Sequence, residues 1–276
     1  MIKTDRYQYQ QQYIDHGYKE LHIPAGPNGS YQMEKNALHI WPRGGYMLIA
    51  LPNPDGSFTL TLFFAWEGPE SFASLPTTDA AEAFFARIFP DALSLMPDFR
   101  TQWETNPASS LVIMRCDPWQ FNGTVALIGD AAHAIVPFYG QGMNAGFEDC
   151  TVLDDLLDAH GEDWANVLPQ YSRKQKPNGD AIAELALLNF IEMRDLVGQP
   201  EFLLQKKIEA WFSNKHPDRW TPLYTQVTFS HTPYAEALAN GRRQEAIMRE
   251  VMALPGIEER WDGAEVEALL LERTAR

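Results

Sequence analysis

The sequence of 276 residues is 45% hydrophobic and 21% charged, as expected of a globular protein that buries its core without disulfides or metal. A net charge of −15 at pH 7 repels phosphate backbones and anionic lipid, so neither nucleic acid nor a membrane is an expected partner. The two cysteines, Cys116 and Cys150, lack the spacing of a zinc site, and the N-terminal residues lack the apolar core of a signal peptide. We therefore expect a cytoplasmic location.

Residues 18–64 have the two-residue periodicity of β-strands. The runs KNALHIW, YMLIAL and SFTLTLFF are rich in β-branched and aromatic residues, and PRGG and PNPDG separate them as turns. In the last run, alternate apolar residues share one face, namely Phe58, Leu60, Leu62 and Phe64. This pattern predicts an antiparallel sheet that is largely covered on both faces.

A short helix and two further strands are expected next. Residues 78–89 open with Thr78 or Asp79 as a candidate N-cap and place apolar residues at helical spacing. The run SSLVIMRCDPW is typical of a strand. Val125–Ile128 form a continuous apolar run that ends in Gly-Asp, which favours a strand buried on both faces and commonly a parallel one.

From Asn144 onward the periodicity is helical. One apolar stripe contains Phe147, Cys150, Leu153 and Leu157, and Gly161 is a reasonable C-cap. The acidic clusters FEDC and LDDLLD are expected to be solvated helix faces. The fold class is therefore mixed, α+β or α/β. We predict three regions, which are a β-sheet region (1–121), a segment of strand, loop and helix (122–164) and a mainly helical region (165–276).

The stretch GQGMNAG, residues 140–146, almost matches the dinucleotide fingerprint G-x-G-x-x-G, but one residue too many separates its second and third glycines. A helix start offers unpaired amides and a positive dipole end, and glycines let a flat or anionic group approach the backbone. Asp130, at the expected strand end, can accept hydrogen bonds from sugar-type hydroxyls. The alternative is that Asp130 only caps a helix or forms a salt bridge, and that the glycines only shape a turn.

As a whole, the 24 residues LIGDAAHAIVPFYGQGMNAGFEDC are more specific than their parts. They resemble the second flavin-contacting motif of the class A flavoprotein aromatic monooxygenases, the para-hydroxybenzoate hydroxylase-like family. The resemblance implies that Asp130 bonds the ribityl chain of FAD and that the helix start faces the pyrimidine edge of the flavin. The cofactor-binding residues that it implies are Gly129, Asp130, Pro137, Gly140, Gln141, Gly142, Met143 and Asn144. It implies no catalytic side chain and no metal, and His133 is expected to be a packed or capping residue.

Six segments resemble the kynurenine-hydroxylating branch of this family: MEKNALHIWPRG, MLIALPN, SFTLTLF, the flavin motif, NFIEMRD and PLYTQVTFS. The implied reaction is the NADPH-dependent hydroxylation of L-kynurenine by O₂ at carbon 3. Asn189 and Tyr224 would bind the amino-acid end of the substrate. The residues implied to wall its ring are Leu38, Met47, Ile49, Leu51, Thr61, Phe63, Pro137 and Phe138. Judged without the family, Asn189 is an ordinary helix-surface amide, Tyr224 a core tyrosine, and the apolar strand residues ordinary core.

One motif of that family is missing from the sequence. No G-x-G-x-x-G for the FAD pyrophosphate occurs in it, so we expect the chain to be the C-terminal part, about 60%, of a monooxygenase. Such a chain has an open sheet edge and is predicted to associate with a separate N-terminal half or with itself. Two alternatives stay open, which are a non-catalytic fragment that binds an aromatic ligand or a partner chain, and a hydroxylase of another aromatic substrate.

Overall fold

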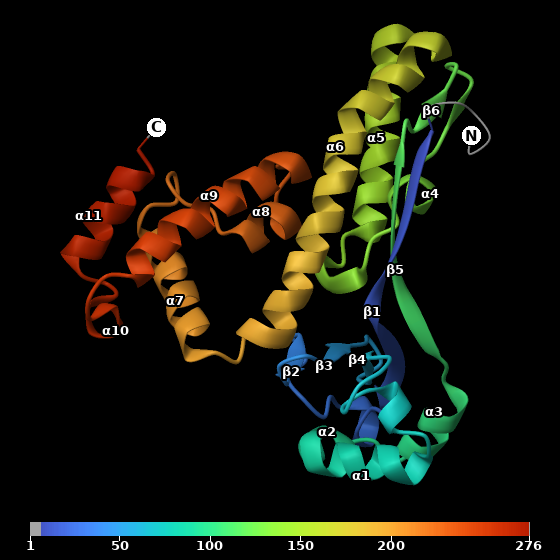
Figure 1. The fold of residues 1–276 in the computed structure, drawn as a ribbon, viewed down its shortest axis with the longest axis vertical. Coiled ribbons are helices and arrows are strands. Elements are labelled where there is room, and N and C mark those ends of the chain that lie inside the picture. Colours follow the sequence, from blue (N-terminus) through green and yellow to red (C-terminus); the bar gives the residue numbers. More distant parts are fainter. Residues whose placement is uncertain (1–6, 276) are drawn as a thin grey trace. The chain divides into compact units, whose positions relative to one another are not determined.

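The computed structural model describes residues 7–275, which divide into two compact units (Figure 1). Within that range the first unit holds residues 7–12, 113–190 and 199–275, and the second holds 13–112 and 191–198. The three regions predicted from the sequence stay a prediction. Their outermost residues, 1–6 and 276, lie outside the described part of the chain.

A five-stranded sheet has the strand order β2-β3-β4-β1-β5. The strands are β1 (Gln8–Ile23), β2 (His39–Pro42), β3 (Met47–Pro52), β4 (Phe58–Ala65) and β5 (Ala108–Asp117). β3 pairs antiparallel with β2 and with β4, and β4 pairs antiparallel with β1, which confirms the predicted antiparallel sheet. β1 and β5 each continue from the second unit into the first.

One face of the sheet in the second unit packs against three helices, α1 (Thr78–Ile88), α2 (Pro90–Leu93) and α3 (Phe99–Thr105). The core between them is strongly aromatic and contains Phe58, Phe64, Phe84, Phe85, Phe89 and Phe99. The N-cap of α1 is Thr77 rather than Thr78 or Asp79. Its backbone is extended, as an N-cap requires, and its hydroxyl accepts the Ala80 amide at 3.2 Å.

A π-helical segment, Glu192–Leu196, belongs to the second unit and contacts the turn between β2 and β3. The Gly45 amide donates to Asp195 Oδ1 at 2.8 Å, and the Gly44 amide donates to the Arg194 carbonyl at 3.2 Å. The Arg194 guanidinium donates to the Asp195 carboxylate and holds the pKa of that carboxyl below its ordinary value. Residues 191–198 are therefore part of the second unit, although the helices before and after them belong to the first.

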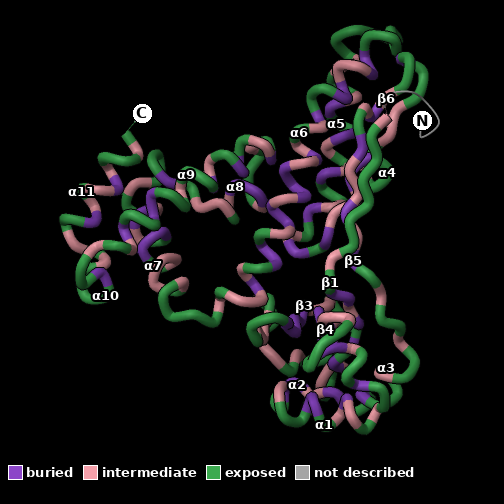
Figure 2. The backbone as a smooth tube through the Cα atoms, viewed as in Figure 1, coloured by how far each residue is buried: buried purple, intermediate pink, exposed green. Residues whose placement is uncertain are grey.

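The first unit is mainly helical. Its helices are α4 (Asp130–His133), α5 (Gly142–His160), α6 (Trp164–Ile191), α7 (Pro200–Lys215), α8 (Leu223–Phe229), α9 (Tyr234–Met252), α10 (Ile257–Arg260) and α11 (Ala264–Arg273). α5 and α6 run side by side, and Figure 2 shows buried residues along both. None of the helices in the described part of the chain is long and apolar enough to cross a membrane. Residues 7–275 contain no group of three or more side chains placed to hold a metal ion.

Candidate functional site

The Gly-Asp turn differs from the predicted buried strand. β7 spans only Val125–Ala126 and pairs antiparallel with β6 (Gln120–Phe121), so the expected strand over Val125–Ile128 is wrong in length and direction. Val125 is 48% and Ile128 39% exposed. Ile128 is exposed because it lines a cavity, whereas Ala126 and Leu127 in the middle of the run are partly buried against a core cluster.

Gly129 places Asp130 at the start of the one-turn helix α4. Its backbone has φ 58° and ψ −141°, a conformation in which a side chain is strongly disfavoured. The amides of Ala132 and His133 donate to the Gly129 carbonyl at 2.8 and 3.0 Å, which closes the turn. The Gly-Asp pair thus makes a sharp bend that ends with an exposed carboxylate.

The second wall of the site is the loop that leads into α5. Pro137–Tyr139 form a 3-10 turn, and Gly140 follows in the left-handed conformation with φ 66°. A Cβ built on Gly140 would meet nothing within 4 Å, so this backbone is open to an approaching group. α5 starts at Gly142, where its free amides and the positive end of its dipole favour negative charge.

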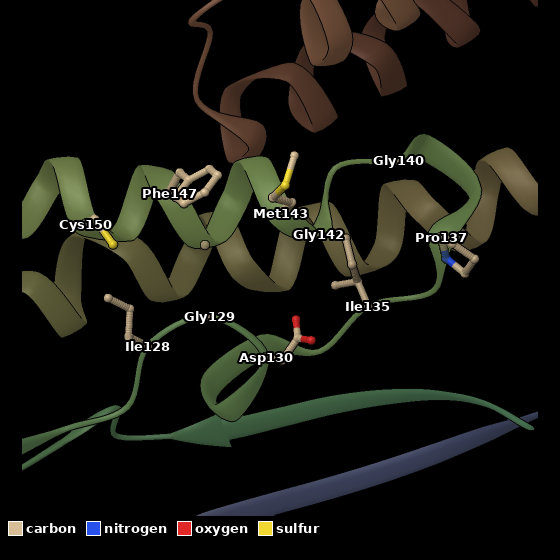
Figure 3. Close-up of a pocket in the computed structure, with 11 residues that line it drawn as sticks. Ile128, Gly129, Asp130, Ile135, Pro137, Gly140, Gly142, Met143, Phe147 and Cys150 are labelled. Carbon is tan, nitrogen blue, oxygen red and sulfur yellow. The ribbon is translucent and has the colours of Figure 1, made fainter. Parts of the chain in front are cut away.

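These two walls enclose a cavity of about 610 Å³ in the first unit (Figure 3). Six of the predicted cofactor residues line it, namely Gly129, Asp130, Pro137, Gly140, Gly142 and Met143. Figure 3 shows the Asp130 carboxylate directed from the turn toward the start of α5. The structure therefore brings the carboxylate and the helix start together in one cavity.

The other two predicted cofactor residues do not line the cavity. Gln141 is buried, and its side-chain oxygen accepts hydrogen bonds from Asn144 Nδ2 at 3.0 Å and from the Tyr234 hydroxyl at 3.1 Å. Both residues hold the loop and the helix start in place. Their contact with a cofactor stays a prediction.

The apolar stripe predicted for α5 faces the core only in its second half, where Leu153 and Leu157 are partly buried. Phe147 is 62% exposed and Cys150 is exposed, and both line the cavity together with Ile128, Ile135 and Gly146. The face of α5 that packs into the core contains Ala145, Asp149 and Val152 instead. Helical spacing finds such a stripe but cannot tell whether it faces a core or a ligand.

The acidic cluster that includes Asp149 is not the solvated face that was expected. Asp149 is 1% exposed, and Glu148 beside it is half-buried. Burial, and after it the charge of Asp149, raises the pKa of both Glu148 and Tyr171. A buried carboxyl group therefore lies on the side of α5 that faces the core.

The predicted substrate residues of the first unit lie next to the loop. Asn189 is buried, and its Nδ2 donates to the Phe138 carbonyl at 2.7 Å. The Phe138 ring stacks on Phe190 at 4.2 Å between centroids. Tyr224, on α8, is half exposed and stacks on Tyr139 at 5.6 Å. Both Asn189 and Tyr224 therefore contact loop residues, and their contact with a substrate stays a prediction.

Five of the six substrate residues predicted in this region share one face of the sheet in the second unit, and the sixth, Leu38, directly precedes β2. In the register of β3 and β4, Met47 opposes Phe63 and Ile49 opposes Thr61. This face is the one opposite the core that is covered by α1–α3. Met47, Ile49 and Phe63 are buried, whereas Leu38 and Leu51 are exposed. Their role in a substrate site stays a prediction.

Comparison with known proteins shows which proteins this chain is similar to. Residues 90–186 match the model of a family described as an FAD binding domain. Kynurenine 3-monooxygenase of Flavobacterium psychrophilum is 53% identical over 272 residues, which cover 99% of this chain and 61% of that protein. The Dictyostelium discoideum protein of the same name is 48% identical over 264 residues, covering 91% of this chain and 57% of that protein. Over nearly its whole length the chain is similar to proteins named kynurenine 3-monooxygenase, and its central part matches the FAD binding domain. The resemblance seen in the sequence is thereby confirmed.

The chain spans 61% of the length of the Flavobacterium psychrophilum relative. Among solved structures, the tetrameric form of 2-methyl-3-hydroxypyridine-5-carboxylic acid oxygenase has a TM-score of 0.54 at 19% identity, covering 66% of this chain and 48% of that chain. This likeness confirms the mixed fold of helices and sheet that was predicted.

Proposed function

We propose that the chain carries the flavin site and part of the substrate site of an FAD-dependent monooxygenase that hydroxylates L-kynurenine at carbon 3. The relatives' names suggest this reaction. The observation that carries the proposal for this chain is the cavity in which the Asp130 carboxylate and the start of α5 lie on facing walls. The small-molecule partners are L-kynurenine, NADPH and O₂. We also propose a cytoplasmic location, which the two free cysteines support.

The residues of the cavity fit the ribityl and ring portions of FAD. Asp130 offers acceptors for ribityl hydroxyls, while the α5 amides and dipole suit the electron-rich pyrimidine edge of a flavin. The glycine backbone at Gly140 and Gly142 leaves room for a flat ring to approach. When bound, FAD takes electrons from NADPH and activates O₂ for oxygen transfer to an aromatic ring.

The chain's own residues then bind and orient the substrate. Asn189 and Tyr224, which contact the loop at Phe138 and Tyr139, are the proposed contacts of the amino-acid end. An amide and a phenol can both hydrogen-bond a carboxylate. Two apolar surfaces are proposed for an aromatic ring, each within one unit. In the second unit the surface contains Leu38, Met47, Ile49, Leu51, Thr61 and Phe63, and in the first unit it contains Pro137 and Phe138. Such a surface excludes water from the site of oxygen transfer.

The flavin site is tested by titrating the 276-residue chain with riboflavin, which carries the ring and ribityl chain but no phosphate, while following flavin fluorescence. We expect saturable binding that Asp130→Ala weakens by about tenfold or more, because a hydrogen bond to a charged acceptor is lost. The matched control is Asp154→Asn, at an exposed position of α5, which should leave the affinity unchanged. Unsaturable binding, or equal affinity of the Asp130 variant, contradicts the site.

The reaction is tested in a fusion that supplies the portion of the Flavobacterium psychrophilum relative outside the matched region. We expect NADPH-dependent formation of 3-hydroxykynurenine, and weaker kynurenine binding by about tenfold or more in Asn189→Ala and Tyr224→Phe. Faster turnover of another aromatic acid than of L-kynurenine would overturn the substrate assignment. Unchanged kynurenine affinity in both variants would remove these two residues from the site.

A further inference from the structure

Asp149 lies under the Gly-Asp turn and is bonded to both sides of it. Its Oδ2 accepts the Gly129 amide at 2.9 Å and the His133 Nε2–H at 2.7 Å. An ionised carboxylate only accepts, so opposite it His133 is assigned the tautomer that carries a proton on Nε2. Gly129 directly precedes the helix that begins at Asp130, and His133 is the last residue of that helix. One buried oxygen atom thus holds the turn before and after Asp130.

The second carboxylate oxygen of Asp149, Oδ1, is also held by a hydrogen bond. Gln175 Nε2, on α6, donates to Asp149 Oδ1 at 3.3 Å. The orientation of the Gln175 amide is set by Asn178, whose Nδ2 donates to Gln175 Oε1 at 3.0 Å. A buried carboxylate is costly unless donors surround it, and here three side-chain or backbone donors do so.

His133 is held from its other side by an aromatic stack. Its ring lies 4.9 Å from that of Trp119, with 30° between the ring planes. Trp119 is itself buried, and its Nε1 donates to the Cys116 carbonyl at 3.0 Å. A Cβ on Gly179 would lie 2.6 Å from the Trp119 ring and 3.1 Å from His133 Cβ, so α6 approaches closely only because residue 179 is glycine.

We propose that Asp149 is a positioning residue that fixes the direction of the Asp130 carboxylate in the cavity, acting through Gly129 and His133. The proposal rests on the proposed function of Asp130 as a flavin ligand. α4 has a single turn, and its two internal bonds both go to the Gly129 carbonyl. A single turn does not set its own orientation. β5 holds the end of the turn, because the Met114 amide donates to the Ala134 carbonyl at 2.9 Å, and the two bonds to one buried carboxylate oxygen hold Gly129 and His133. The effect of Asp149 on a ligand should therefore pass through Asp130.

A purely structural role for Asp149 and a positioning role lead to different expectations for the variant Asp149→Asn. If the hydrogen bonds of Asp149 only stabilised the fold, Asp149→Asn would lower the free energy of unfolding but leave the flavin affinity of the folded chain unchanged. If Asp149 positions Asp130, the flavin affinity of the folded Asp149→Asn variant falls. Asn is close in size to Asp but presents one oxygen acceptor and no charge, so it cannot accept both the Gly129 and His133 hydrogens and the Gln175 hydrogen as Asp149 does.

The experiment is a double-mutant cycle of riboflavin affinity on the 276-residue chain, with far-UV circular dichroism at the assay temperature to show that each variant is folded. We expect Asp149→Asn to weaken riboflavin binding by about tenfold, and Asp154→Asn to leave it unchanged. In the Asp130→Ala background, Asp149→Asn should cause no further loss. Additive losses, or an unchanged affinity in Asp149→Asn, would overturn the proposal.

A second pair of variants keeps the test decisive if Asp149→Asn does not fold. His133→Gln retains a nitrogen donor toward Asp149, whereas His133→Leu removes it. We expect the Gln variant to bind riboflavin more tightly than the Leu variant, and equal affinities would count against the proposal. Failure of the proposed function is separable, because in that case Asp130→Ala itself would leave riboflavin affinity unchanged.

Discussion

Replacing Gly146 with alanine should change the stability of the chain and the flavin affinity of the cavity in opposite directions. It lies inside α5, where glycine costs about 0.5–1 kcal/mol relative to alanine. A Cβ at this position would lie 3.7 Å from Gly129 Cα, which is ordinary van der Waals contact. Gly146→Ala should therefore raise the free energy of unfolding by about 0.5–1 kcal/mol. The same methyl group lies in the cavity wall opposite the Gly-Asp turn, so flavin binding should weaken.

The assay combines urea unfolding, followed by far-UV circular dichroism, with the riboflavin titration on the same preparations. Gly179→Ala is the matched control because it also replaces a helical glycine but drives its methyl into the Trp119 ring at 2.6 Å. Overpacking costs about 1–3 kcal/mol, so this variant should not share the stabilisation. A destabilised Gly146→Ala, or one that binds riboflavin as tightly as the original chain, would refute the reasoning.

Three further variants test single features of the structure. Gly129→Ala should lower the free energy of unfolding by about 1–3 kcal/mol, measured in urea, because residue 129 has φ 58°. Thr77→Ala should lower the free energy of unfolding by about 1 kcal/mol in the same assay, since the side chain caps α1. An unchanged free energy of unfolding would show that the Thr77 side chain does not stabilise α1. Burial raises the pKa of Tyr234 to about 12, above its unfolded value near 10, so stability should fall as the pH rises from 10 toward 12. Tyr234→Phe should flatten that fall in alkaline unfolding curves, and an identical curve would exclude Tyr234 as its source.

The sequence predicted those parts of the fold whose residues carry a local pattern. The alternation in Phe58–Ala65 and the turns around it predicted β4 and its antiparallel neighbours. The start of β1 was not predicted, because Gln8–Gln12 are mostly glutamine and exposed, and they contain no aliphatic or β-branched residue to mark them as a strand. Pairing with neighbours far along the chain, rather than local propensity, makes that segment extended.

The candidate site also has a part that the sequence predicted and a part that it did not. The loop and the helix start were predicted because their glycines and Asp130 follow one another in the sequence. Asp149 was expected to be solvated, since a carboxylate in a helix usually is. Its donors Gly129 and Gln175 lie 20 and 26 residues away, and only the folded chain brings them to one carboxylate.

Neither compact unit is a continuous stretch of sequence, and this affects how the protein folds during synthesis. Residues 191–198 complete a unit that otherwise ends at residue 112, and residues 7–12 belong with residues that begin at 113. A nascent chain usually folds its N-terminal domain first, while the rest is still being made. Here the second unit lacks the partner of its Gly44–Gly45 turn until residue 198 has emerged from the ribosome. No single cut within these 276 residues therefore yields two parts that each contain a complete unit.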